Sequence, residues 1–294
     1  MKALHTSGIK LLPLCRLFGV SSQSYYQRKD TYYEREVFKG LLLDYATSLR
    51  KDMPRLGCYK LYEKSKVYFS AEMQIGRDAY FNLLRAYGLM LRIKKRRRIR
   101  TTDSNHPYKR YPDLINGTGF VSTCACQLWV SDITYIPLST SAKRFCYLSL
   151  ITDAYSRKII GWKLADSLQY KHTEEALMTA LKDSAKAGFD LNGMIHHSDR
   201  GVQYAYPDYI ELLKSYNCRI SMTQSGDPRD NAIAERVNGI LKVEWLDAYE
   251  FTSLRHAKKV IAKIIDIYNN DRPHMGIGMK VPNQMHRPTK GKCA

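Results

Sequence analysis

The chain has 294 residues, of which 44% are hydrophobic and 26% are charged, and this ordinary globular composition excludes a mainly disordered or collagen-like protein. No apolar run approaches the ~18 residues of a membrane span and the N-terminus lacks a secretion signal, so we expect a cytoplasmic protein with no membrane partner. The 47 Lys+Arg against 28 Asp+Glu give a net charge of +19, which is typical of nucleic-acid-binding proteins, although such a charge also serves solubility.

The first 100 residues predict a small, all-helical DNA-binding region. Residues 7–27 fit a helix-turn-helix and, equally well, a plain helical hairpin, with Gly19 in the turn and Ser21 or Ser22 as the cap of the second helix. The periodicity of apolar residues predicts three further helices, over 34–49, 57–67 and 75–90. Three short helices around one core are a common DNA-binding arrangement.

A basic run closes this region, and seven of the nine residues from 92 to 100 are Lys or Arg. Such a run is either a DNA-binding segment or a solvated stretch of charge. Residues 1–120 hold 24 Lys+Arg and 10 Asp+Glu, a net +14, against 23 and 18, a net +5, in residues 121–294. We therefore assign DNA binding to the run and in particular to Lys94, Lys95, Arg96, Arg97 and Arg98. Residues 101–120, with two prolines and two glycines, predict a linker.

From residue 121 the pattern becomes that of an α/β domain. Strands are predicted over 127–139, 145–156, 157–166, 193–199 and 218–224, and the first three form an antiparallel meander. Helices are predicted over 172–188, 206–217, 229–247 and 253–270. This order predicts a mixed sheet flanked by helices, with two long helices at the C-terminal end, over residues 121–294.

Three acidic residues of this domain occupy informative positions. Asp132 lies in the middle of the first strand, where a buried acid is costly unless something pairs with it. Asp199 follows the strand 193–197, near the end where open α/β sheets place their functional groups. Glu235 lies on the helix 229–247. Each also has a structural interpretation: an edge strand or salt bridge for Asp132, a capping turn for Asp199 and a solvent-facing helix for Glu235.

The helical geometry around Glu235 groups several polar residues. At about 100° per residue, Asn231, Glu235, Asn238 and Lys242 fall within about 60° of one another, and the apolar residues fall on the opposite side. The polar face is either a solvent face or the wall of a site. Lys242 lies two turns beyond Glu235, roughly 10 Å along the axis, which suits a cation that holds a phosphate or base. We assign DNA contacts to Lys242 and to two residues beside the acids, Asn231 and Arg200, and Asn231 could also orient the glutamate.

Together the three carboxylates predict a site for a hard cation. Mg²⁺ prefers carboxylate oxygens and retains waters that leave room for phosphate, and two such ions can promote phosphodiester chemistry. With the net positive charge, this combination favours a metal-dependent nuclease or strand transferase.

Four segments resemble the integrase core of bacterial insertion-sequence transposases: WVSDITYI (129–136), LITDAYSRKIIGW (150–162), HHSDRGVQY (196–204) and DNAIAERVNGILKVEW (230–245). They are most similar to the OrfB-type protein of the IS-three family, which is related to retroviral integrases. The interval between Asp199 and Glu235, 35 residues, is the spacing of the family's DD(35)E motif, and Lys242 matches its basic position. The tail YNNDRPHMGIG (268–278) and three N-terminal segments, 15–26, 54–63 and 88–100, are also similar to the family.

The resemblance implies an RNase H-like fold in which Asp132, Asp199 and Glu235 are catalytic residues and ligands of Mg²⁺, with Mn²⁺ as a substitute. It further implies binding of DNA, both the terminal inverted repeats of a mobile element and its target, followed by metal-dependent strand cleavage and joining. Water or a 3′-OH would be the nucleophile. The resemblance also implies a bacterial cytoplasmic protein that is associated with the nucleoid when it is bound to DNA. It would act as a homo-oligomer, with the product of an upstream overlapping frame as a further partner.

Two other functions remain compatible with the sequence. A non-catalytic DNA-binding regulator or domesticated integrase-like protein would bind ends without cutting them, and the intact acids count against it. An RNase H-like nuclease would cut without joining, and the basic N-terminal region and long C-terminal helices count against that alternative.

Overall fold

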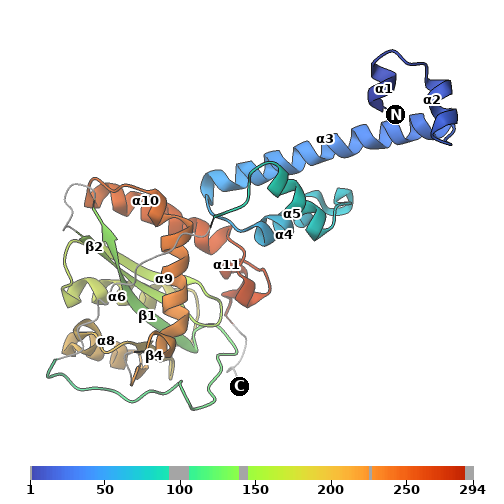
Figure 1. The fold of residues 1–294 in the computed structure, drawn as a ribbon. Coiled ribbons are helices and arrows are strands. Elements are labelled where there is room, and N and C mark those ends of the chain that lie inside the picture. The colour runs from blue at the N-terminus through green and yellow to red at the C-terminus, as the bar shows by residue number, and fades with distance from the viewer. Residues whose placement is uncertain (1, 93–105, 139–144, 225–226, 289–294) are drawn as a thin grey trace. The chain divides into compact units, whose positions relative to one another are not determined.

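The computed structural model describes residues 2–92, 106–138, 145–224 and 227–288. The chain divides into two compact units, which are drawn in Figure 1. The helical unit comprises residues 1–51 and 57–91, and the sheet unit comprises residues 52–56 and 92–294. No helix in the described ranges is both long and apolar enough to cross a bilayer. The basic residues Lys94, Lys95, Arg96, Arg97 and Arg98, to which DNA binding is assigned, lie outside the described residues.

The helical unit contains one helix that is much longer than the sequence predicts. Its elements are α1 (Lys2–Thr6), α2 (Leu11–Leu17), α3 (Ser22–Asp52), α4 (Cys58–Phe69), the 3₁₀ turn η1 (Ser70–Glu72) and α5 (Arg77–Ala86). The turn at Gly19 (φ +64°) and the Ser21 cap, whose Oγ accepts the Ser24 N–H at 3.0 Å, agree with the prediction. A separate helix over 34–49 is wrong, because no proline or glycine interrupts residues 22–39 and α3 continues through them.

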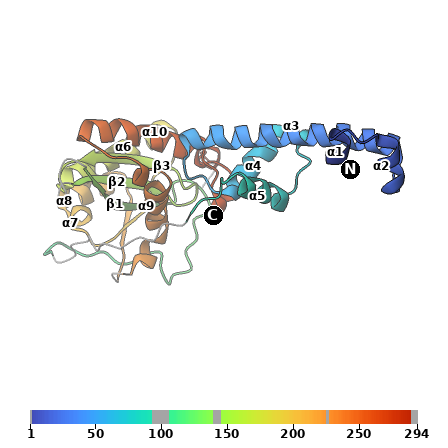
Figure 2. The ribbon, with the colours of Figure 1, turned by 45° about the horizontal axis from the view of Figure 1, so that its top comes forward.

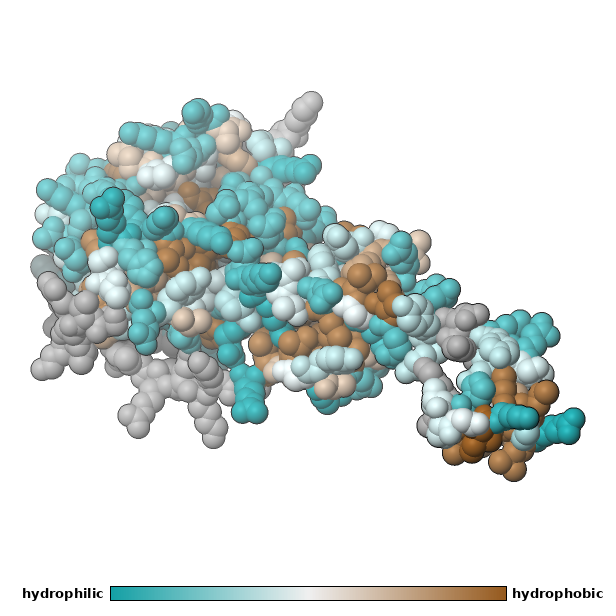
Figure 3. Space-filling model, turned by 90° about the horizontal axis from the view of Figure 1, so that it is seen from above, coloured by the Kyte–Doolittle hydropathy of each residue, from teal (hydrophilic) through white to brown (hydrophobic). Residues whose placement is uncertain are grey.

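Aromatic side chains join α3 to α4 in this unit. Tyr45 stacks on Tyr68 with ring centroids 4.3 Å apart, and Phe38 meets Phe69 edge-on at 5.3 Å. Beneath these pairs lie the buried residues Leu42, Ala46, Leu61, Tyr80 and Leu84. Figure 3 shows that apolar residues also gather on part of the surface. Around the first two helices the exposed ones are Leu4, Ile9, Leu12, Leu17 and Phe18, and exposed apolar surface of this kind is typical of interaction sites.

The sheet unit is built on five strands in the spatial order β3-β2-β1-β4-β5. The strands are β1 (Leu128–Pro137), β2 (Phe145–Asp153), β3 (Ile159–Ala165), β4 (Ile195–Ser198) and β5 (Arg219–Met222). The first three pair antiparallel, whereas β1 pairs parallel with β4, and β4 with β5. This arrangement confirms the predicted meander and the predicted mixed sheet. Because β1 is the central strand, an edge-strand interpretation of Asp132 is excluded.

Helices cover both faces of the sheet, as Figure 2 shows for α6 and α9. The helices are α6 (Tyr170–Lys186), α7 (Val202–Ala205), α8 (Pro207–Ser215), α9 (Ala232–Glu244), α10 (Leu254–Asn270) and α11 (Pro282–Met285), with 3₁₀ turns η2 (Pro228–Asn231), η3 (Leu246–Ala248) and η4 (Met275–Ile277). Trp129 packs with residues of α6 and α8, whereas Leu128 and Val130 pack with Ala234 of α9. Alternation along β1 therefore directs Asp132 to the α9 side.

Residues of the C-terminal motif YNNDRPH (268–274) bond α9 and α10 to the rest of the sheet unit. Arg272, which is 1% exposed, donates two hydrogen bonds to the carboxylate of Glu244 in α9, at 2.7 and 2.6 Å. Asn269 of α10 pairs with both the N–H and the carbonyl of Ile159, and Tyr268 donates its hydroxyl proton to the Arg157 carbonyl. The motif YNNDRPH therefore has a structural role, because its side chains join the last helices to one another and to the sheet.

The described part of the expected linker, residues 106–120, packs on the sheet unit. Tyr108 and Tyr111 contact the core on the α6 face. The Leu114 N–H donates to Ser221 Oγ of β5 at 2.9 Å, and Asn116 Nδ2 donates to the Asp230 carbonyl at the same distance.

Candidate active site

Strand pairing brings Asp132 and Asp199 together. In the parallel β1–β4 pair, Ser131 lies opposite Ser198, so Asp132, in the middle of β1, lies beside Asp199, which follows the carboxyl end of β4. Such ends are where open α/β sheets bind ligands. The Asp199 Oδ1 also accepts the N–H of Gly201 at 3.0 Å, which fixes the loop that leaves β4.

The carboxylate of Asp132 is held in one orientation and is hard to ionise. Its Oδ1 accepts the Ile133 N–H at 2.8 Å and its Oδ2 accepts the Nδ2 of Asn238 at 2.5 Å. Removal from water, followed by the negative charges of Asp199 and Glu235, raises the pKa of Asp132 to about 8. The two other acids are therefore close enough to oppose its charge, and we call Asp132, Asp199 and Glu235 the acidic triad.

Helix α9 supplies the third carboxylate and also the amide that holds Asp132. Glu235 is exposed in the first turn of the helix, and Asn238 is 4% exposed one turn later. The predicted grouping of these residues on one face is confirmed. This face of α9 is not exposed to solvent along its whole length, because Asn238 contacts Asp132 of β1.

Asn231 lies in a different environment from the one expected. It is 6% exposed, and its Nδ2 donates to the Ser131 carbonyl at 2.9 Å. Its Oδ1 is buried and has no hydrogen-bond partner among the described residues, and a contact of Asn231 with DNA or with Glu235 stays a prediction.

The two basic residues assigned to DNA lie on the elements that carry the acids. Lys242 is partly exposed in the last turn of α9. Arg200 follows Asp199, and its Nε donates to the Thr223 carbonyl at 2.7 Å, so part of its guanidinium ties β4 to the end of β5. Sequence reasoning placed Asn238 on the correct face without giving it a role, since its partner lies 106 residues away.

The raised pKa of Asp132 predicts an unusual pH dependence of stability. Between about pH 4 and pH 8 the metal-free folded chain retains a proton that the unfolded chain loses, so the free energy of unfolding falls as pH rises. Asp132→Asn cannot lose that proton. We expect it to stabilise the metal-free protein by a few kcal/mol at pH 8.5, since one pKa unit corresponds to about 1.4 kcal/mol, and by little at pH 4. Urea unfolding in a chelator at both pH values measures this, and parallel pH profiles for the two proteins would contradict it.

The residues present fit a divalent cation. Burial, followed by the charges of Asp199 and Glu235, raises the pKa of Asp132, and a cation relieves both the burial of this charge and the repulsion. The Oδ1 of Asn238 is buried and has no hydrogen-bond partner within the described ranges, which leaves an acceptor for water beside the triad. Oxygen donors of this kind are typical of Mg²⁺ or Mn²⁺ sites.

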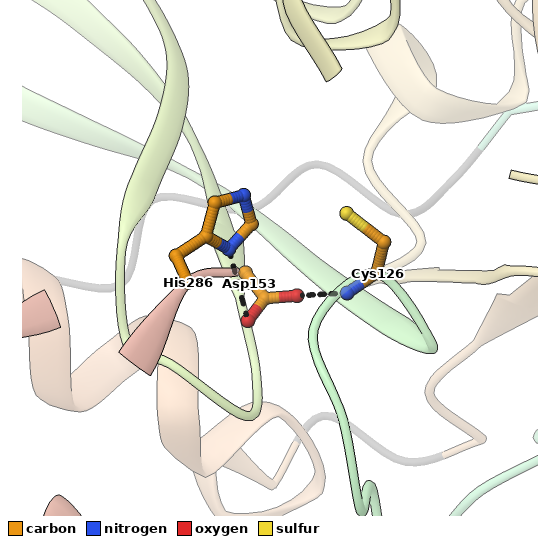
Figure 4. A group of neighbouring side chains, drawn as sticks. All are labelled: Cys126, Asp153 and His286. Atoms are coloured by element: carbon orange, nitrogen blue, oxygen red, sulfur yellow. Dashed lines mark hydrogen bonds and ion pairs between the residues drawn. The ribbon is translucent and has the colours of Figure 1, made fainter. Parts of the chain in front are cut away.

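A second group of ligand-type side chains, Cys126, Asp153 and His286, is drawn in Figure 4. The buried Asp153 carboxylate lies between the His286 ring and the backbone of Cys126. It accepts hydrogen bonds from the Cys126 N–H at 2.7 Å and from the N–H and hydroxyl of Ser156. Burial and the Asp153 charge raise the pKa of the Cys126 thiol to about 12, whereas metals bind the thiolate. We assign this group a structural role, in which Asp153 joins the start of β1, the β2–β3 turn and the C-terminal segment.

Comparison with known proteins identifies the sheet unit. The model of a family described as "Integrase core domain" matches residues 122–228, and a second model of the same description matches residues 216–282. Among solved structures, the catalytic core domain of HTLV-2 integrase in complex with magnesium is 17% identical, with a TM-score of 0.42 over 56% of this chain and 99% of that one.

Three curated relatives come from insertion sequences. The uncharacterized 31 kDa protein of insertion element IS600 from Shigella sonnei is 32% identical over 90% of this chain and 94% of its own. The putative transposase for IS986/IS6110 from Mycobacterium tuberculosis is 30% identical over 77% and 82%, and transposase InsF for IS3A from Escherichia coli is 33% identical over 54% and 53%. The chain therefore belongs to the IS-three family of insertion-sequence transposases, and its sheet unit is an integrase core domain.

Proposed function

We propose that this chain is a DDE transposase that binds the ends of a mobile DNA element and catalyses metal-dependent strand cleavage and strand transfer. The observation that carries the proposal is that Asp199 and Glu235 lie near the buried Asp132, so that burial and then the two charges raise the pKa of its carboxyl. A protein that only bound DNA would gain nothing from this repulsion, whereas a metal-dependent polynucleotidyl transferase uses it to attract cations.

In this mechanism the acidic triad would hold Mg²⁺, or Mn²⁺ in its place. Bound divalent cations supply charge neutralisation at the phosphate and activate a water or 3′-OH nucleophile. Asn238 fixes the Asp132 carboxylate in the orientation needed for this role, and β1 and β4 hold the two aspartates side by side. Much of phosphoryl-transfer catalysis is positioning of this kind.

The test of the proposal is a cleavage and joining assay. The purified protein is incubated with a labelled duplex that carries the element's terminal inverted repeat, with Mg²⁺, Mn²⁺ or a chelator. We expect cleavage at the end and joining to a target duplex only with a divalent cation. A non-catalytic regulator would bind the duplex and leave it intact in every condition, and a nuclease would cut it without joining; either result would overturn the proposal.

Binding of the DNA backbone is expected to depend on the positively charged N-terminal part. Affinity should fall steeply as salt rises, because each phosphate contact releases counterions. Neutralising Lys94, Lys95, Arg96, Arg97 and Arg98 together should flatten the salt dependence more than neutralising five cations after residue 121. Fluorescence anisotropy between 50 and 300 mM salt, about the range over which such contacts respond, measures the slopes, and equal slopes would assign the run to solvation.

Lys242 is expected to position the DNA end beside the triad. Lys242→Ala should lower strand transfer and selection of the correct end on the order of 10-fold or more, whereas Lys242→Arg keeps the charge and much of the rate. Metal binding at the triad should persist in both, as measured by the Mn²⁺-dependent shift of the unfolding temperature. A Lys242→Ala protein with wild-type cleavage and joining would make this a surface lysine.

We also propose that the chain acts on DNA as a homo-oligomer and, in the element, together with the product of an upstream overlapping frame. The exposed apolar residues around α1 and α2 support an interaction surface in the helical unit. Light scattering of the protein with and without an end duplex measures the oligomeric state, and a monomer in both conditions would contradict it.

A further inference from the structure

The start of helix α9 is fixed by bonds from two strands of the sheet. Asn231, the residue before the helix, makes no side-chain capping bond within it. Its Nδ2 donates instead to the carbonyl of Ser131, one residue before Asp132. The preceding carbonyl, that of Asp230, lies 3.1 Å from Nε2 of His197, two residues before Asp199. Each strand that carries an aspartate of the triad therefore also holds the beginning of the helix that carries the glutamate.

The hydrogen-bond directions around His197 follow from its partners. The side chain is 0% exposed, and a neutral imidazole has one N–H. A carbonyl only accepts, so Nε2 donates to Asp230. The Nδ1 then accepts the hydroxyl proton of Ser221 at 2.8 Å, and Ser221 Oγ in turn accepts the Leu114 N–H. Both ring nitrogens are used, and this arrangement fixes the ring plane.

The adjacent histidine does not take part in this arrangement. Nε2 of His196 lies 2.8 Å from Ser131 Oγ and 2.9 Å from the Tyr209 hydroxyl, and Tyr209 belongs to the core on the α8 face. Alternation along β4 thus gives the two histidines different tasks: His196 is a core residue, whereas His197 reaches the element that leads into α9.

We propose that His197 is a positioning residue that sets Glu235 against Asp199 by holding the carbonyl of Asp230. This inference rests on the proposed metal-dependent function and names a residue outside the triad on which that function depends. Asn116 donates to the same carbonyl, so two side chains hold the residue that leads into α9. Residues that orient metal ligands through such bonds change metal affinity or activity about 10- to 100-fold when they are replaced.

A matched pair of variants isolates the bond. Gln places its amide nitrogen near the position of histidine Nε2, whereas the shorter Asn reaches only to about Nδ1, so His197→Gln can still donate to Asp230 and His197→Asn cannot. We expect His197→Asn to lower the cleavage rate about 10- to 100-fold and to raise the Mn²⁺ concentration for half-maximal activity by a similar factor. His197→Gln should recover most of both losses, and the Kd for end DNA should not change in either.

Two further variants separate positioning from stability. Tyr209→Phe removes a buried hydrogen bond on the α8 face and should lower the unfolding temperature without changing the Mn²⁺ requirement. Ser221→Ala frees the His197 ring to turn and should raise that requirement in the same direction as His197→Asn, and it tests the proposal if the asparagine variant does not fold. Equal losses in the Gln and Asn variants, or a wild-type Mn²⁺ requirement in His197→Asn and Ser221→Ala, would overturn the proposal.

A readout without catalysis keeps this inference distinct from the proposed function. The Mn²⁺-dependent rise of the unfolding temperature reports occupancy of the triad even in a chain that does not cut DNA. A 10-fold weaker Mn²⁺ response in His197→Asn than in wild type supports the positioning role whether or not the wild type transposes, and identical responses refute it. Absence of cleavage by the wild type refutes the proposed function alone.

Discussion

Asp132→Asn, Asp199→Asn and Glu235→Gln are each expected to abolish cleavage and joining while end binding persists. Each replacement removes one negative oxygen from the proposed cation site. The loss of transition-state charge neutralisation should lower the rate by at least about 10²- to 10³-fold. The amides keep nearly the same volume, so the fold is retained.

The assay uses a labelled end duplex with cleavage, joining and Kd measured on the same preparations. Asp208→Asn is a suitable control, because this acid lies at the start of α8 and accepts the hydroxyl of Tyr170 rather than facing the triad; its rates should equal those of the wild type. Normal cleavage by any triad variant would remove that residue from the mechanism.

The second large effect concerns the Arg272–Glu244 pair. The side chains are 2% and 12% exposed and form two hydrogen bonds, so removal of one partner leaves an uncompensated buried charge. We expect Arg272→Met or Glu244→Leu to lower the free energy of unfolding by about 3–5 kcal/mol. The double variant should recover a large part of this loss, because two apolar residues leave no charge behind.

An exposed ion pair of the same unit supplies the comparison. Lys263 contacts Asp52 at 2.8 Å, with the two side chains 70% and 56% exposed, and Lys263→Ala should cost no more than about 1 kcal/mol. Urea unfolding of the four variants measures the differences. Equal losses at the buried and the exposed pair would show that burial of Arg272 does not contribute as described.

Local patterns in the sequence were sufficient to predict the strands of the sheet and to single out the three acids. Alternation placed Asp132 on the face of β1 opposite Trp129, and the helical period placed Glu235 and Asn238 together, because both periods are properties of the backbone. The partners of these side chains depend on pairings across 100 residues or more, such as Asn238 with Asp132 and Asn231 with Ser131, and a single sequence does not report them.

Two errors in the predicted organisation have different physical causes. The length of α3 was underestimated because residues 22–33 carry few apolar residues at helical spacing, although nothing in them breaks a helix. The segment 106–120 has the prolines and glycines of a linker, yet Tyr108 and Tyr111 find an apolar surface on the sheet unit. Composition describes what a segment can do alone, and tertiary packing decides where it lies.

The 35-residue interval between Asp199 and Glu235 corresponds to one connection of the fold. It contains α7, α8, β5 and η2, the crossover by which a chain leaves one parallel strand, adds the next and returns across the sheet. The proposed chemistry requires only that the carboxylates lie close together. The topology sets the number of residues that separate them in the sequence. A chain cut within this interval would yield one fragment with both aspartates and another with the glutamate, so that catalysis would report on the reassembly of the two halves.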